Sequence, residues 1–92
     1  MEKGRKLVEF LEDKGYENSV LLEPEQYDEA VVGVTWEGRV VYSYEKIVDM
    51  LMRVDGMPYE DAIEYTDYNT VRGVDYMGPY APILIYGIED VI

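Results

Sequence analysis

The sequence contains neither cysteine nor histidine. Without cysteine there is no disulfide framework, no thiolate metal site and no thiol nucleophile. Without histidine the chain lacks the commonest general base and the commonest metal ligand of proteins. Glycine-rich phosphate loops and the GxSxG and HExxH motifs are missing as well. These absences disfavour an enzyme, and we expect no cofactor and no bound metal.

Two patterns come closest to a chemical site. Residues 67–69 (Asp-Tyr-Asn) begin like a calcium-binding loop, but Val71 and Arg72 stand where that loop needs a ligand and a glycine. Glu60 and Glu64 form a carboxylate pair of the kind that supports general acid–base catalysis when a cleft raises one pKa. Because 20 of the 92 residues are acidic, such pairs arise by chance, and a solvated helix face explains this one more simply.

Basic residues are scarce, with 8 lysines and arginines against 20 acids and a net charge of −12. A surface so poor in cations argues against direct binding of nucleic acid or of an anionic membrane. No apolar run approaches the roughly 18 residues of a membrane-spanning helix, and no signal-peptide core is visible. The 48% apolar content argues against disorder. We therefore expect residues 1–92 to form a single folded domain in the cytoplasm.

The longest β-branched stretch of the chain predicts a hairpin. Two valine-rich runs, residues 30–35 and 39–42, flank Trp36, Glu37 and Gly38. Gly38 suits the left-handed position of a short hairpin loop. The runs are nearly continuous in valine, which predicts central strands rather than a half-exposed pair. Because a two-stranded hairpin is not stable alone in water, the other segments must cover one face and extend the edge.

Three segments carry the apolar period of a helix. Residues 3–14 predict an amphipathic helix that stops at Gly15. Residues 44–54 predict a second, with Ser43 as its N-cap. A third is expected over residues 58–70, since proline is tolerated in a first turn. The expected apolar side of this third helix is Tyr59, Ala62, Ile63 and Thr66.

The remaining segments complete the predicted order α-β-β-α-α-β. Residues 20–22 are apolar between turn signals and fit either a strand or a buried loop. Residues 83–86 predict a final strand bounded by Gly87. The expected fold is α+β, a small antiparallel sheet made of the central hairpin and the C-terminal strand. About three helices should pack on one face of that sheet.

The negative charge is distributed unevenly. Residues 1–14 hold four acids and four bases, so the whole excess lies in residues 15–92. Residues 55–67 hold five acids and no base. On a helix of about 100° per residue, Glu60, Glu64 and Asp67 fall within about 60° of one another. Like charges at this spacing cost a helix a few tenths of a kcal/mol per pair, which a protein selected only for solubility could avoid with lysines.

These acids motivate a hypothesis of nucleic-acid mimicry. Successive acids are separated by a rise of about 4.5–6 Å along the helix axis, which is close to the spacing of phosphates along one nucleic-acid strand. The acidic face would then occupy a basic groove on a partner protein. The alternative is a solvated acidic surface without any partner. Tyrosines beside the acids favour an interface, although Tyr42, Tyr44 and Tyr59 fit core packing. The predicted partner-binding residues are Asp55, Glu60, Asp61, Glu64, Tyr65, Asp67, Tyr68 and Tyr76.

The segment from Tyr68 to Arg72 supports two further interpretations. In the first, Asn69 adopts the conformation at a helix C-terminus and Arg72 donates to the last helix carbonyls. In the second, Asn69, Arg72 and Tyr76 form a small polar ligand pocket.

Several of these segments also resemble a known group of sequences. They are YD at 27–28, AVVGVT at 30–35, GRVVY at 38–42, Lys46, EY at 64–65, DYNT at 67–70, Arg72, YMG at 76–78 and PI at 82–83. Together they resemble a family of small acidic proteins without established activity, encoded in bacteriophages, prophages and bacterial genomes. The Tyr-Asn-Thr-x-Arg segment is its most specific part.

The resemblance implies a mobile-element setting and, for a phage-encoded protein, the host cytoplasm. Small acidic phage proteins often look like inhibitors of host defence, including anti-CRISPR and anti-restriction proteins that mimic DNA. We therefore expect a stoichiometric inhibitor of a nucleic-acid-handling protein. The alternative is a non-enzymatic accessory module that binds a protein or a small ligand without mimicry. The sequence is compatible with a homodimer.

Overall fold

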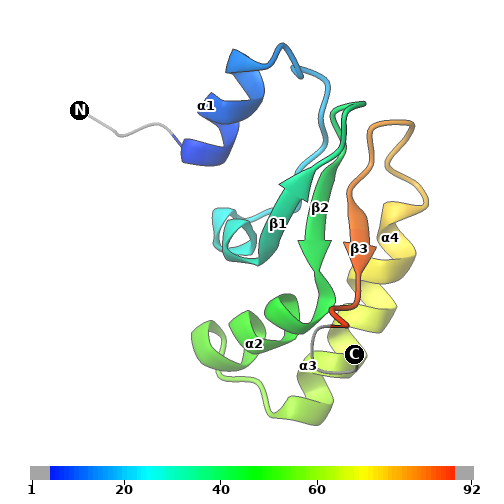
Figure 1. Cartoon of the computed structure of the whole chain (residues 1–92). Coiled ribbons are helices and arrows are strands. Elements are labelled where there is room, and N and C mark those ends of the chain that lie inside the picture. The colour runs from blue at the N-terminus through cyan, green and yellow to red at the C-terminus, as the bar shows by residue number, and fades with distance from the viewer. Residues whose placement is uncertain (1–4, 89–92) are drawn as a thin grey trace.

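The fold is a three-stranded sheet accompanied by helices, as a computed structural model shows for residues 5–88 (Figure 1). The strands lie in the order β1 (Val31–Val34), β2 (Val40–Ser43) and β3 (Ile83–Ile85). This confirms the α+β class and the order α-β-β-α-α-β. The sheet is mixed, however, because β1 is antiparallel to β2 whereas β3 runs parallel to it. The expectation of a wholly antiparallel sheet is wrong, since the helices between β2 and β3 return the chain to the end where β2 begins.

The predicted hairpin is present and its turn depends on Gly38. The Gly38 N–H donates to the carbonyl of Thr35 at 3.0 Å, and the Thr35 N–H donates to that of Arg39 at 2.8 Å. Gly38 has a φ of 89°, in the left-handed region that residues with a Cβ adopt only at a cost. The sequence therefore identified both the turn and its special residue.

The two hairpin strands differ in burial, contrary to the expectation that both are central. Val40 and Tyr42 of β2 are fully buried, and β2 has a strand on either side. β1 is an edge strand, with a register shift between Val31 and Gly33 and with Val32 exposed. The cause is the position of β3, which pairs with β2 and leaves β1 one neighbour within the described residues.

Helix α2 (Tyr44–Val54) follows β2 without a linker. The Ser43 hydroxyl accepts a hydrogen bond from the Lys46 N–H at 3.2 Å, which confirms the predicted N-cap. The buried side of α2 carries Tyr44, Ile47, Val48, Met50 and Leu51. A short 3₁₀ helix, η1 (Glu25–Ala30), packs against α2, and the sequence analysis missed it. It buries Tyr27 and Ala30.

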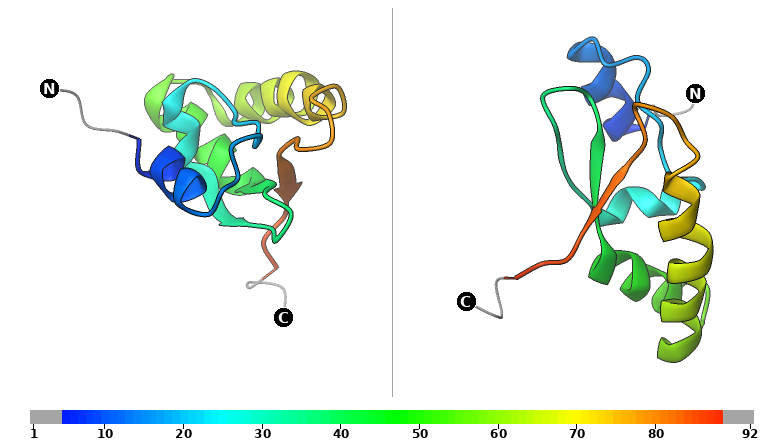
Figure 2. Two further views of the ribbon diagram at one scale, coloured as in Figure 1. Left: turned by 90° about the horizontal axis from the view of Figure 1, so that it is seen from above. Right: turned by 90° about the vertical axis from the view of Figure 1, so that its right-hand side faces the viewer.

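The third predicted helix is longer than expected. It comprises α3 (Tyr59–Tyr65), a π-helical stretch η2 (Thr66–Val71) and α4 (Arg72–Val74) in one continuous run. This run lies along one face of the sheet, and α2 packs against α3 and the end of β2, at the bottom of Figure 1 (Figures 1 and 2). The buried side of the run includes Ala62 and Thr66, as predicted. Tyr59 is instead 60% exposed, because the first turn of α3 lies beyond the end of the sheet.

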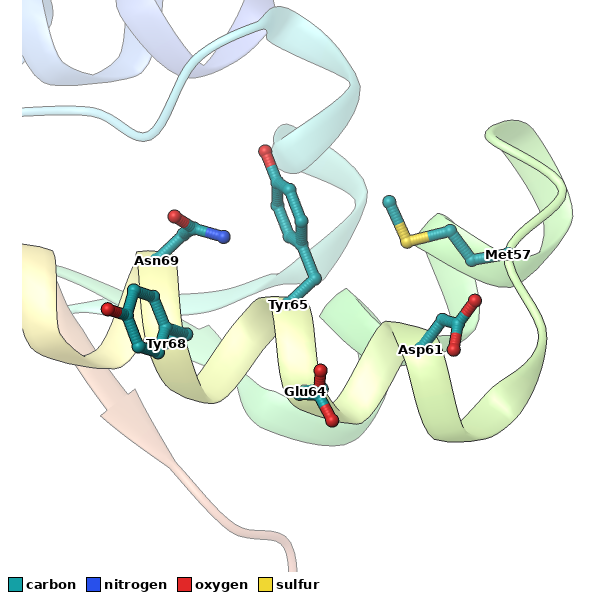
Figure 3. Close-up of a pocket in the computed structure, with 6 residues that line it drawn as sticks. All are labelled: Met57, Asp61, Glu64, Tyr65, Tyr68 and Asn69. Carbon is teal, nitrogen blue, oxygen red and sulfur yellow. The ribbon is translucent and has the colours of Figure 1, made fainter.

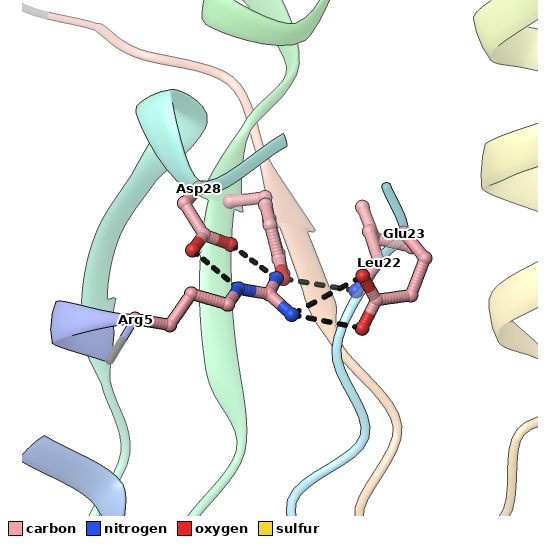
Figure 4. Close-up of polar contacts among 5 residues, drawn as sticks. Arg5, Leu22, Glu23 and Asp28 are labelled. Carbon is pink, nitrogen blue, oxygen red and sulfur yellow. Dashed lines mark hydrogen bonds and ion pairs between the residues drawn. The ribbon is translucent and has the colours of Figure 1, made fainter. Parts of the chain in front are cut away.

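Helix α1 (Lys6–Asp13) lies at the hairpin end of the molecule (Figure 1). It stops as predicted at Gly15, which has a φ of 81°. Residues 3 and 4 of the expected helix lie outside the described residues. Arg5 ties its first turn to the rest of the fold through two hydrogen bonds to the Asp28 carboxylate, at 2.7 and 2.9 Å (Figure 4). The same guanidinium donates to Glu23 at 3.0 Å.

Residues 20–22 form a loop rather than a strand, which decides between the two possibilities left by the sequence. The Val20 N–H donates to the Tyr80 carbonyl at 3.2 Å. The Leu22 N–H donates to the Tyr42 hydroxyl at 3.0 Å, and Leu22 is buried. The loop is thus held between the chain ahead of β3 and the centre of β2.

Replacing Gly38 with alanine should destabilise the protein. An added Cβ would occupy a left-handed conformation and lie 3.0 Å from the ring of Tyr16. We expect the free energy of unfolding to fall by about 1–3 kcal/mol, measured by urea denaturation. Gly33→Ala is the matched control, because no atom lies within 4 Å of a Cβ there. Equal stability of the two variants would show that the turn does not require glycine.

Candidate partner-binding surface

The acidic residues that the sequence analysis singled out all lie on the surface. Glu60, Asp61 and Glu64 are exposed on α3, Asp55 is exposed at the C-cap of α2, and Asp67 is exposed on η2. Among residues 5–88, the ion pairs of Arg5 and Arg53 involve other carboxylates. No lysine or arginine in that range pairs with any of these five. These acids are therefore exposed without an ion pair to any cation in the part of the chain that the structure describes.

Asp67 differs from the other four acids because it is held by the core. The Tyr44 hydroxyl donates a hydrogen bond of 2.6 Å to the Asp67 carboxylate. Tyr44 is buried, and its ring lies 5.0 Å from that of Tyr86. Burial, together with the bond to Asp67, raises the pKa of Tyr44 above its usual value. Asp67 thus fastens η2 to the start of α2.

The predicted interface tyrosines are exposed but do not form one group. Tyr65 and Tyr68 lie on the helical run beside the acids, and Tyr68 is 66% exposed. The guanidinium of Arg72 lies 5.0 Å from the centre of the Tyr68 ring, a cation–π distance. Tyr76 is 89% exposed in the turn after α4 and lines none of the hollows described below.

A hollow of about 370 Å³ lies among the acids and tyrosines (Figure 3). Its lining is Met57, Asp61, Glu64, Tyr65, Tyr68 and Asn69. A second hollow of about 330 Å³ shares Tyr65 and Asn69 with the first. Its other lining residues are Leu21, Leu22, Glu23, Tyr27, Thr70 and Met77. The helical run therefore borders a groove that combines carboxylates with aromatic and thioether side chains.

The three residues of the predicted polar pocket do not together line either hollow. Asn69 lines both hollows, whereas Arg72 and Tyr76 line neither, and Arg72 lies over Tyr68 instead. The alternative interpretation, a helix C-terminus at Asn69, is wrong because the helical run continues to Val74. The π-helical turn of η2 extends the run where the sequence suggested an end.

Sequence reasoning missed the opposite wall of the second hollow. Leu21, Leu22 and Tyr27 lie 42 to 48 residues before Asn69 and meet it only through the tertiary fold. Their apolar character was visible in the sequence, but it predicts burial rather than a binding site. Met57, between α2 and α3, carried no signal either.

Within residues 5–88, no helix has the length and apolar character needed to cross a bilayer. Over the same range, no three acidic side chains converge in a way that could hold a metal ion.

Comparison with known proteins adds no relative. No protein-family model matches the chain, and neither a curated protein nor a solved structure matches it. The resemblance to small acidic phage proteins therefore stays a prediction.

Three buried tyrosines should make the protein sensitive to alkali. Burial raises the pKa of Tyr27, Tyr42 and Tyr44 in the folded state. The folded protein therefore keeps these protons when the unfolded chain loses them, at about pH 10. Their contribution to stability is complete below that pH and is lost as the pH rises through the folded-state values. We expect the free energy of unfolding to fall steeply above about pH 10.

Tyr44→Phe should make this fall less steep, because one of the three groups is removed. At neutral pH the variant should lose about 1 kcal/mol with the hydrogen bond to Asp67. Urea unfolding at pH 8 and at about pH 10.5 measures both effects. Tyr76→Phe applies the same change at an exposed position and is the control. An identical pH dependence in all three proteins would contradict the role assigned to Tyr44.

Proposed function

We propose that the protein is a stoichiometric inhibitor of a nucleic-acid-handling protein. Its acidic surface, defined as Asp55, Glu60, Asp61, Glu64 and Asp67 with the adjacent Tyr65 and Tyr68, would occupy the basic groove of that partner. The observation that carries the proposal is the row of exposed carboxylates on α3 and η2, with which no cation of the described chain forms an ion pair.

Charge and chemistry support this use of the surface. Leaving several like charges together on one helix lowers helix stability. No lysine or arginine among residues 5–88 forms an ion pair with these acids. A partner that carries a lysine- and arginine-rich groove would supply the missing cations. Association between two such surfaces is steered by charge and is accordingly fast at low salt.

The tyrosines would slow dissociation of the complex, which carboxylates alone do little to affect. Contacts between charges at the rim of an interface mainly affect the rate of association, whereas desolvated aromatic anchors slow dissociation. Tyr68 already has the guanidinium of Arg72 over its ring. An arginine of the partner could make the same contact on the exposed ring of Tyr65.

The alternative is an accessory module that binds a protein or a small ligand without mimicry. The hollow beside Tyr65 and Asn69 favours it, because a cavity of about 370 Å³ is within the size range of small-ligand sites. Acids line part of this hollow, so a ligand bound there would be cationic or neutral. Under mimicry, nucleic acid competes with this protein for the partner, whereas under the alternative it does not.

The test uses the immobilised protein and a bacterial host lysate cleared of nucleic acid. We expect it to retain a nucleic-acid-binding protein that is released by a short DNA or RNA duplex and by salt. Glu60→Gln combined with Glu64→Gln should weaken binding to the purified partner by about 3- to 30-fold, mostly through slower association. Surface plasmon resonance at two salt concentrations separates the two rates.

The matched control is Glu9→Gln combined with Glu12→Gln. It makes the same change in net charge on exposed positions of α1, at the other end of the molecule. This control should bind as the parent does. Equal weakening by both double variants would indicate an effect of net charge alone. A partner that binds as well with its nucleic acid already loaded would refute mimicry.

A further inference from the structure

The first hollow, of about 370 Å³, places carboxylates beside aromatic rings. Asp61 precedes Tyr65 by four residues, and Glu64 precedes Tyr68 by four. Side chains at this spacing are neighbours on one side of a helix, so each tyrosine has a carboxylate one turn away. Met57 reaches toward Tyr65 from the loop before α3 (Figure 3). The hollow therefore combines negative charge with flat and apolar surface.

The charge of the lining determines the sign of the occupant. Neither hollow is lined by a lysine or an arginine. In the second hollow the carboxylate is that of Glu23, which already forms an ion pair with Arg5 at 3.0 Å. In the first hollow, Asp61 and Glu64 are exposed and form no ion pair with a cation of residues 5–88. The first hollow thus favours a cation and repels an anion.

The aromatic part of the lining distinguishes between the two cationic side chains. The ammonium of lysine is a compact and strongly hydrated charge, whereas the guanidinium of arginine is planar, weakly hydrated and stacks on aromatic faces. Its N–H groups form a fork that matches a carboxylate. The methylene stem of an arginine can pack on apolar surface such as that of Met57. Rings, carboxylates and a thioether in one hollow therefore suit arginine better than lysine.

The chain itself contains one such contact. The guanidinium of Arg72 lies 5.0 Å from the centre of the Tyr68 ring, although Arg72 does not line the hollow. One of the two rings thus already holds a guanidinium, and the hollow is not filled by it. Tyr65 is 43% exposed, and no cation of residues 5–88 lies over its ring. Tyr65 is therefore the ring that can receive a guanidinium from another molecule.

We propose that the first hollow is a pocket for one arginine side chain of the partner, with its guanidinium stacked on Tyr65 and donating to Asp61 and Glu64. The inference rests on the proposed function, because the arginine is taken from the basic groove of that partner. It adds a preference for arginine over lysine. Carboxylates attract either cation, so Tyr65 is the residue that determines this preference.

Two blocked tripeptides, glycyl-arginyl-glycine and glycyl-lysyl-glycine, test the preference without the partner. Each carries one positive charge, so a difference in affinity cannot come from net charge. Titration of the isotopically labelled protein, followed by amide chemical shifts, gives both dissociation constants. We expect both tripeptides to perturb residues 61–69. The arginine peptide should bind about 2- to 5-fold more tightly, as a cation–π contact at an exposed site allows.

Substitutions assign the preference to the ring. Tyr65→Leu should bring the two affinities together, whereas Tyr65→Phe keeps the ring and should retain the preference. Glu64→Gln should weaken both tripeptides to a similar extent, because it removes charge and leaves the ring. Tyr76→Leu removes an exposed aromatic outside both hollows and should change neither affinity.

Equal affinity of the parent protein for the two tripeptides overturns the inference, and so does a preference that survives Tyr65→Leu. Neither result touches the proposed function, since the acidic surface would still attract a basic groove. Tetramethylammonium that perturbs the same amides at lower concentration than the arginine peptide assigns the hollow to a quaternary amine and also overturns it. A preference that depends on Tyr65, with no partner in the lysate that nucleic acid releases, refutes the proposed function and supports the arginine pocket.

Discussion

The burial of Tyr42 is the constraint on which the rest of the structure depends. This side chain is fully buried at the centre of β2, and its hydroxyl accepts the N–H of Leu22. An unpaired hydroxyl at that depth would cost about 1–3 kcal/mol, so the loop before η1 must pass over the sheet at this point. Arg5, at the start of α1, donates hydrogen bonds to Asp28 and to Glu23, which follows Leu22 (Figure 4). These contacts fix the position of α1.

The central position of β2 also determines where the acids lie. β2 continues directly into α2, whose first residue, Tyr44, donates to Asp67 on η2. This bond fixes the helical run with its buried threonines inward and its other acids outward. The acidic surface thus lies toward the opposite end of the molecule from α1 (Figure 1).

Local chemistry in the sequence was enough to predict much of the fold. Gly38, Gly15 and Ser43 were identified correctly because turns and caps depend on single residues. The parallel pairing of β3 was not predictable, because the apolar pattern of residues 83–86 fits a parallel and an antiparallel strand equally well. The exposure of the acids, Tyr65 and Tyr68 followed from helical periodicity. Periodicity did not predict the exposure of Tyr59 or the part of the second hollow lined by Leu21 and Tyr27, because tertiary packing decides the environment of these residues.

The central claim is that the carboxylates of α3 and η2 form a docking surface for cations of a partner. Titration of the isotopically labelled protein with a short arginine-rich peptide, followed by amide chemical shifts, tests it most directly. The account predicts shift changes concentrated in residues 60–70, with those of α1 unaffected despite its exposed Glu9 and Glu12. Changes spread evenly over all exposed acids would contradict it, because the surface would then be acidic without being a site.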